Sequence, residues 1–84
     1  MIRKPVMINL STGLEARPVA QLVQVASQYE SSIYIESEGK RVNAKSIMGM
    51  MTLVLSAGDR IVVSADGKDE EEALAGVEAY LRGN

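Results

Sequence analysis

The chain has 84 residues, of which 46% are hydrophobic and 24% are charged, and its formal net charge is −2 at pH 7. This balance predicts one globular domain over residues 1–84, because disordered chains carry too few apolar residues to form a core. The sequence contains no Cys and no His. Disulfides, thiolate metal sites, Cys nucleophiles and Ser–His catalysis are therefore excluded. We expect no catalytic residue, no metal site and no cofactor, so the chain is not expected to be an enzyme.

The distribution of charge argues against two further classes of protein. The nine basic residues are scattered along the chain, whereas a nucleic-acid surface needs them clustered. The longest uncharged run, residues 46–58, is too short to span a bilayer. The first five residues lack the apolar stretch of a signal peptide. We therefore expect a cytoplasmic protein with no membrane partner and no direct contact with nucleic acid.

Hydrophobic periodicity predicts the first two elements. Val6, Ile8 and Leu10 occupy every second position, as in a half-buried strand, and Pro5 should keep the start of that strand at a sheet edge or irregular. An apolar residue at every third or fourth position then predicts an amphipathic helix over residues 16–29. Those apolar positions are Val19, Leu22, Val23 and Ala26. Pro18 is compatible with this helix because it lies in the first turn.

A β-hairpin and a short helix are expected next. Two strands, containing Ile33 and Val42, flank Glu38 and Gly39, and a glycine suits the positive φ angle of a two-residue turn. A short helix over residues 47–53 should follow, with Ser46 as its N-cap.

The last third of the sequence predicts a strand and a helix. Alternating residues from Ile61 to Ala65 indicate a fourth strand. Asp69 and Glu72 have the spacing of a capping box, and Glu70 and Glu71 suit the positive end of a helix dipole. The resulting order, βαββαβα, predicts an α+β domain in which helices cover one face of a mostly antiparallel sheet.

Three short segments carry more than packing information, and each has two interpretations. The glycine-containing loop before Pro18 either binds an anion at the helix start or simply lets Glu15 complement that helix. The run from Ile47 to Met51 either exposes some apolar side chains to a partner or packs them all inward. Ser46 is either a plain N-cap or a phosphorylation site. The acidic run at residues 69–72 is interpreted as helix-start charge and not as a metal site.

Two of these segments resemble a known family. Residues 12–18 read TGLEARP and residues 43–51 read NAKSIMGMM. They are similar to the two signature motifs of the HPr family, the small phosphocarriers of the bacterial sugar phosphotransferase system, and the similarity extends over essentially the whole chain. The resemblance implies an HPr-like open-faced β-sandwich, in which three helices cover one face of a four-stranded antiparallel sheet.

The resemblance also implies a regulatory function rather than phosphoryl relay. Glu15 stands at the position of the family's phosphoryl-accepting histidine. Members that lack this histidine but keep the serine form the Crh (catabolite repression HPr) branch, found in Gram-positive bacteria. In this branch we expect Gln rather than Glu at position 15. Ser46 would be phosphorylated by HPr kinase/phosphorylase, and the phosphoserine form would act as corepressor of the transcription regulator CcpA.

The family fold would place a partner-binding surface beside Ser46. The residues that the resemblance assigns to it are Arg17, Ala20, Gln24, Ile47, Met48 and Met51. Two other functions stay open. The chain could be an interaction module that regulates a metabolic enzyme without phosphorylation, or a homodimer formed by exchange of the strand that carries Pro5.

Overall fold

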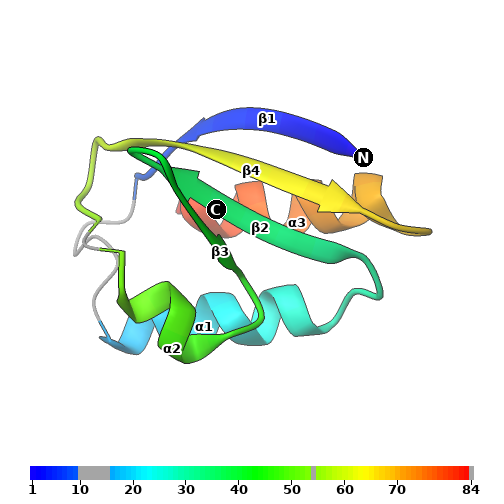
Figure 1. Ribbon diagram of the computed structural model, residues 1–84, viewed down its shortest axis with the longest axis horizontal. Coiled ribbons are helices and arrows are strands. Elements are labelled where there is room, and N and C mark those ends of the chain that lie inside the picture. The colour runs from blue at the N-terminus through cyan, green and yellow to red at the C-terminus, as the bar shows by residue number, and fades with distance from the viewer. Residues whose placement is uncertain (10–15, 54, 84) are drawn as a thin grey trace.

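The molecule has two layers, a single antiparallel sheet and three helices packed on one of its faces (Figure 1). The computed structural model describes residues 1–9, 16–53 and 55–83, and of Ala16 and Arg17 it describes only the backbone. The elements are β1 (Ile2–Met7), α1 (Ala16–Ser27), β2 (Ser32–Ser37), β3 (Lys40–Asn43), α2 (Ile47–Met51), β4 (Arg60–Asp66) and α3 (Glu70–Leu81).

The sheet has the strand order β1-β4-β2-β3, and every neighbouring pair is antiparallel. The first and last strands in sequence therefore pair with each other, with Ile2 opposite Ala65 and Met7 opposite Arg60. Helices α1 and α3 pack against each other beneath the sheet, and α2 packs on α1 and β3 (Figure 1). This arrangement confirms the predicted α+β fold, an open-faced β-sandwich with the order βαββαβα.

The hydrophobic core lies between the two layers and is almost entirely aliphatic. Its largest fully buried side chains are Ile8, Val19, Leu22, Ile33, Ile35, Met50, Val63, Val77 and Leu81. They come from every helix, from the middle strands β2 and β4 and, for Ile8, from the segment after β1. Burying one such side chain contributes about 1.5–3 kcal/mol, which makes these residues the main source of stability.

The hairpin turn between β2 and β3 has the predicted geometry. Glu38 and Gly39 have φ angles of 51° and 81°, and Ser37 pairs with Lys40 across the turn. Two successive positive φ angles define a type I′ turn, whose twist matches that of the flanking strands. Gly39 adopts this conformation without the penalty that a Cβ atom brings.

The first strand and the first helix differ from the predicted boundaries. Strand β1 begins at Ile2 rather than at Val6, because the backbone from Ile2 onward already pairs with β4 at the sheet edge. Pro5 lies within this edge strand opposite Val62, as its missing N–H group requires. Helix α1 ends at Ser27 rather than at residue 29. Its end tightens because Tyr29 N–H donates to the carbonyl of Ala26, three residues back.

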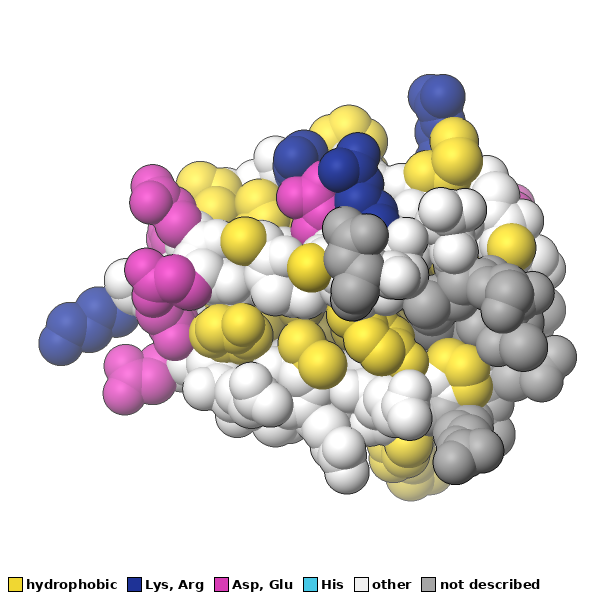
Figure 2. Space-filling view, turned by 180° about the vertical axis from the view of Figure 1, so that it is seen from behind, with side chains coloured by type: hydrophobic (Ala, Val, Ile, Leu, Met, Phe, Trp, Pro, Cys, Tyr) yellow, Lys and Arg dark blue, Asp and Glu magenta, His cyan; other side chains and the backbone are white. Residues whose placement is uncertain are grey.

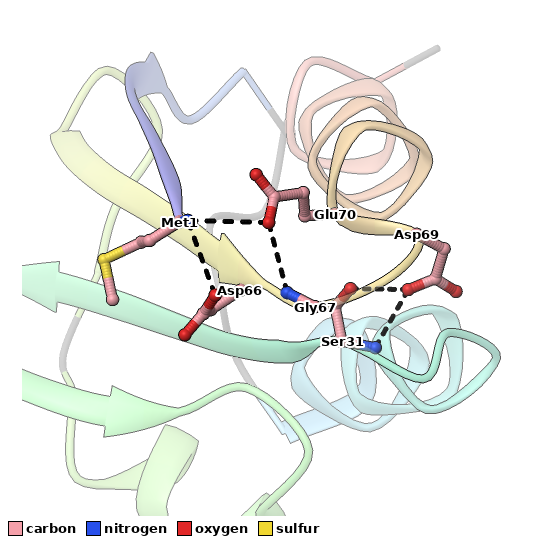
Figure 3. A network of polar contacts seen from close by, with 6 residues as sticks. All are labelled: Met1, Ser31, Asp66, Gly67, Asp69 and Glu70. Atoms are coloured by element: carbon pink, nitrogen blue, oxygen red, sulfur yellow. Dashed lines mark hydrogen bonds and ion pairs between the residues drawn. The ribbon is translucent and has the colours of Figure 1, made fainter.

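The predicted capping box at the start of α3 is wrong. Asp69 is the N-cap residue, but its side chain makes no capping hydrogen bond. Its carboxylate instead accepts hydrogen bonds from the backbone N–H groups of Glu30 and Ser31, both at 2.9 Å, and from Ser31 Oγ at 2.5 Å. Three donors from the turn before β2 outcompete the helix N–H groups, so Asp69 ties that turn to α3 (Figure 3).

Glu70 makes the local contacts that Asp69 does not. Its Oε1 accepts a hydrogen bond of 3.2 Å from the N–H group of Gly67 and lies 3.5 Å from the amino group of Met1 (Figure 3). The same amino group lies 3.4 Å from Asp66 Oδ1. Glu70, followed by Asp66, raises the pKa of the Met1 amino group.

In the described parts of the chain, no helix is both long enough and apolar enough to cross a membrane. Nor do those residues hold a group of three or more His, Cys, Asp or Glu side chains that could bind a metal ion.

Candidate functional site

Ser46 occupies the N-cap of α2, as predicted. Its backbone is extended, with φ −106° and ψ 112°, and Ser46 Oγ accepts a hydrogen bond of 3.1 Å from the N–H group of Gly49. The Ser46 carbonyl in turn accepts the first backbone bond of the helix, from Met50 at 2.9 Å. An N-cap of this kind stabilises a helix by about 0.5–2 kcal/mol.

The turn before Ser46 is held by Asn43 and Lys45. The N–H group of Ser46 donates to the Asn43 carbonyl at 3.0 Å, and that of Lys45 donates to Asn43 Oδ1 at 2.8 Å. Lys45 Nζ reaches the carbonyl of Tyr29, just beyond α1, at 2.6 Å. These bonds fix the serine between β3 and α1. The sequence prediction missed this role of Asn43, although an Asn side chain commonly accepts a hydrogen bond from the backbone N–H group two residues later, as in an Asx turn.

Three apolar side chains of α2 point into solvent beside Ser46. Ile47 is 44% exposed, Met48 is 80% exposed and Met51 is 55% exposed, whereas Met50 is completely buried. The interpretation in which all four side chains pack inward is therefore wrong. We refer to Ile47, Met48 and Met51 as the α2 patch. Exposed flexible methionines of this kind are typical of surfaces that bind partners.

Helix α1 lies directly beside α2 and provides the rest of the predicted surface (Figure 1). Gln24 is exposed and Ala20 is half-buried, and their spacing of four residues places them on the same face of α1. Arg17 belongs to the first turn of α1, where only the backbone is described. Glu15 lies outside the described residues, so its place relative to Ser46 stays a prediction.

The first turn of α1 is tied to α3 by a tyrosine. The Tyr80 hydroxyl lies 3.0 Å from the Pro18 carbonyl oxygen and 3.0 Å from Gln21 Oε1. Partial burial raises the pKa of Tyr80, so its hydroxyl stays protonated and donates at neutral pH. Tyr80 also packs against the hydrophobic core. Figure 2 shows a row of hydrophobic atoms across this side of the molecule. This contact sets the position of the helix that carries Arg17.

Helix α2 carries no charged side chain of its own. Helix α2 has no acidic side chain in its first turn. Three acidic residues, Glu70, Glu71 and Glu72, lie in the first turn of α3. Figure 2 shows a group of Asp and Glu side chains at one end of the molecule. A negatively charged group added to Ser46 therefore meets no acidic neighbour on its own helix.

A sequence profile of the family described as "PTS HPr component phosphorylation site" matches residues 2–82. The chain belongs to the HPr family. The match covers nearly every residue, so it includes both the Ser46 region and the loop that contains Glu15.

Relatives of this HPr-like chain include regulators and phosphocarriers. It is 46% identical over 82 residues to the HPr-like protein Crh of Bacillus subtilis, an alignment that covers 98% of this chain and 96% of Crh. A crystal structure of the phosphocarrier HPr from Bacillus anthracis superimposes with a TM-score of 0.92 at 46% identity, covering 95% of each chain. A crystal structure of Bacillus subtilis Crh, described as a dimer with a swapped domain, gives a TM-score of 0.81 at 45% identity and covers 100% of this chain and 97% of Crh. The predicted resemblance to Crh is confirmed.

Proposed function

We propose that this HPr-like protein regulates carbon catabolite repression. HPr kinase/phosphorylase would phosphorylate Ser46, and the phosphorylated protein would then bind the transcription regulator CcpA as its corepressor. One observation carries the proposal: the hydroxyl of Ser46 lies at the start of a helix whose next two residues, Ile47 and Met48, are exposed and apolar. We also propose a cytoplasmic location for this chain.

The chemical step belongs to the kinase and not to this chain. Ser46 Oγ attacks the γ-phosphorus of ATP, and the bond from that phosphorus to the β,γ-bridging oxygen breaks. ADP leaves, and the hydroxyl proton passes to a base of the kinase. The product carries a charge of about −1.5 to −2 on a previously neutral side chain. This change of charge is the switch, and no catalytic residue or cofactor of this protein is required.

The α2 patch would supply the contact area of the complex with CcpA. Met48 and Met51 can bury against apolar partner surface, while a partner arginine pairs with the phosphate through two parallel hydrogen bonds. Ala20 and Gln24 extend the same surface along α1, and Arg17 would seek a partner carboxylate. In this proposal, neither the phosphate charge nor the apolar area is sufficient alone for binding to CcpA. Binding to CcpA therefore depends on phosphorylation of Ser46.

Because position 15 is Glu, this chain is not expected to relay phosphoryl groups in sugar transport. A carboxylate cannot form the phosphohistidine of the sugar phosphotransferase system, and the chain has no histidine at any position. Phosphoenolpyruvate with the family's first enzyme should therefore leave the protein unmodified.

The proposal is tested by kinase treatment followed by a binding assay. Mass spectrometry after incubation with HPr kinase/phosphorylase and ATP should show one phosphate on wild type and none on Ser46→Ala. Phosphorylated wild type should then bind immobilised CcpA, and Met48→Ala should weaken this binding. Met7→Ala is the matched control, because Met7 is also exposed but belongs to β1. Equal binding with and without phosphate would contradict the corepressor function and favour an interaction module that works unphosphorylated.

A homodimer is a second property that the relatives favour. The related Crh structure is a dimer with a swapped domain. In this chain β1 is an edge strand that pairs only with β4 among the described strands, so exchanging it between two copies could preserve the same pairing. Sedimentation equilibrium at several concentrations should reveal a monomer–dimer equilibrium. A single species of monomer mass at the highest concentration would contradict the dimer.

A further inference from the structure

Gly49 is an unusual residue for its position in α2. It lies in the middle of a five-residue helix that runs from Ile47 to Met51. Its φ angle is not among the positive values found at other glycines of the chain, so its backbone does not require glycine. Glycine is the least favourable helix residue apart from proline, and alanine is the most favourable. The presence of glycine rather than alanine at position 49 must therefore be explained by the space around its Cα atom.

That space is occupied by Ser46. A Cβ atom at position 49 would lie 3.3 Å from Ser46 Oγ, 3.5 Å from Ser46 Cβ and 3.7 Å from Val42 Cβ. The contact with Oγ is tight but tolerable for a free hydroxyl, which needs to yield by only a few tenths of an ångström. A hydroxyl that carries a phosphoryl group has less freedom to yield, because a bulky tetrahedral group must move with it.

The hydrogen bond between the two residues places the added group on the same side. The N–H group of Gly49 donates to Ser46 Oγ at 3.1 Å, so the oxygen lies directly over residue 49. Once Oγ becomes an ester oxygen, the phosphoryl oxygens are the stronger acceptors for that N–H group. Reaching it brings them next to the Cα atom of residue 49, where glycine leaves room.

We propose that Gly49 is a positioning residue for Ser46 phosphorylation, because the missing side chain leaves space for the incoming phosphoryl group beside Ser46 Oγ. This inference rests on the proposed function of Ser46. It assigns a role to a residue outside the α2 patch, and it distinguishes modification of Ser46 from its capping of the helix.

The first test compares two glycine-to-alanine variants in the kinase reaction. Gly49→Ala should keep the wild-type unfolding midpoint or raise it, since alanine favours helix. Its kcat with HPr kinase/phosphorylase should fall by about tenfold, which is the effect of moderate overpacking, while KM for the protein stays unchanged. Gly39→Ala is the control. It should lower the unfolding midpoint, because a φ angle of 81° penalises alanine, and it should leave kcat unchanged, because nothing lies within 4 Å of the new Cβ atom. Equal kcat values for wild type and Gly49→Ala would overturn the proposal.

A second test does not depend on the kinase. Phosphoserine can be incorporated at position 46 during translation, in wild type and in Gly49→Ala, and the unfolding midpoints can be compared with those of the unphosphorylated proteins. The phosphate should lower the midpoint more when residue 49 is alanine. An identical shift in both backgrounds would show that residue 49 does not crowd the phosphate. If the kinase leaves wild type unmodified, the proposed function fails, whereas this comparison still decides whether Gly49 leaves the necessary room.

Discussion

Lys4 Nζ lies 2.8 Å from Glu78 Oε2, and this ion pair fastens edge strand β1 to helix α3. The carboxylate is the more enclosed partner, with 15% of its side chain exposed against 49% for Lys4. Arg82 Nε lies 3.7 Å from the same oxygen. Lys4 Nζ also donates a hydrogen bond of 3.1 Å to Glu78 Oε1, and this bond is the largest cause that lowers the pKa of Glu78.

Replacing this carboxylate should loosen the edge strand measurably. We expect Glu78→Gln to lower the free energy of unfolding by about 0.5–1 kcal/mol in urea denaturation at low salt, the upper range for partly exposed ion pairs. The loss should shrink in about 1 M NaCl, where charges are screened within a few ångströms. Lys4→Met combined with Glu78→Gln should cost less than the sum of the single changes. Strict additivity would show that the two charges do not interact.

Asp69 should make stability depend on acid pH. Hydrogen bonds from Ser31, followed by Glu30, lower the pKa of Asp69 in the folded protein below its ordinary value of 3.8. Because the folded-state pKa is the lower one, its contribution is fully present above the unfolded pKa and is lost as pH falls through the folded pKa. Thermal midpoints of wild type and Asp69→Asn should differ at pH 6, and the difference should shrink as the pH falls below 3.8, the ordinary pKa of Asp. A constant difference across this range would contradict the prediction.

Gly67 should tolerate no side chain. Its φ angle is 154°, and a Cβ atom there would lie 2.8 Å from the backbone Cα of Ser31, which cannot move aside as a flexible side chain would. A positive φ angle alone costs a residue with a Cβ atom about 1–2 kcal/mol. We expect Gly67→Ala to lower the free energy of unfolding by more than that amount. Gly58→Ala, with φ 93° and no neighbour within 4 Å, measures that smaller cost. Equal urea midpoints for the two variants would show that the close approach to Ser31 carries no penalty.

Glu15→His tests whether only the phosphoryl acceptor separates this chain from the relay members of its family. The variant should accept phosphate from phosphoenolpyruvate and the family's first enzyme, since Arg17, Pro18 and the α2 patch remain. Folding should survive, because a surface carboxylate near a helix start contributes under about 1 kcal/mol. Acid-labile label on the variant but not on wild type is the expected result. A folded variant without label would mean that the docking residues have diverged as well.

Predictions from the sequence were correct where a local residue pattern determines the structure. They failed where contacts with residues distant in the sequence determine it. Ser46 and Gly39 were predictable because capping and type I′ turns demand particular residue types. The role of Asp69 was mispredicted because its hydrogen-bond donors, Ser31 and Glu30, lie 38 and 39 residues away in the sequence. No periodicity within α2 could identify Met50 as the buried methionine, because nearly all five residues of that helix are apolar. Only packing against α1 and β3 distinguishes it from Met48.

The contrast between Met48 and Met50 has a chemical consequence. Peroxide transfers an oxygen atom to a thioether and yields a sulfoxide and water, and the reaction favours accessible sulfur. Met48 is 80% exposed and Met50 is completely enclosed, although one residue separates them. Mild oxidative damage would therefore convert the α2 patch from apolar to polar while leaving the core intact. The protein would still fold, yet its surface beside Ser46 would no longer suit an apolar partner until methionine sulfoxide reductases restored it.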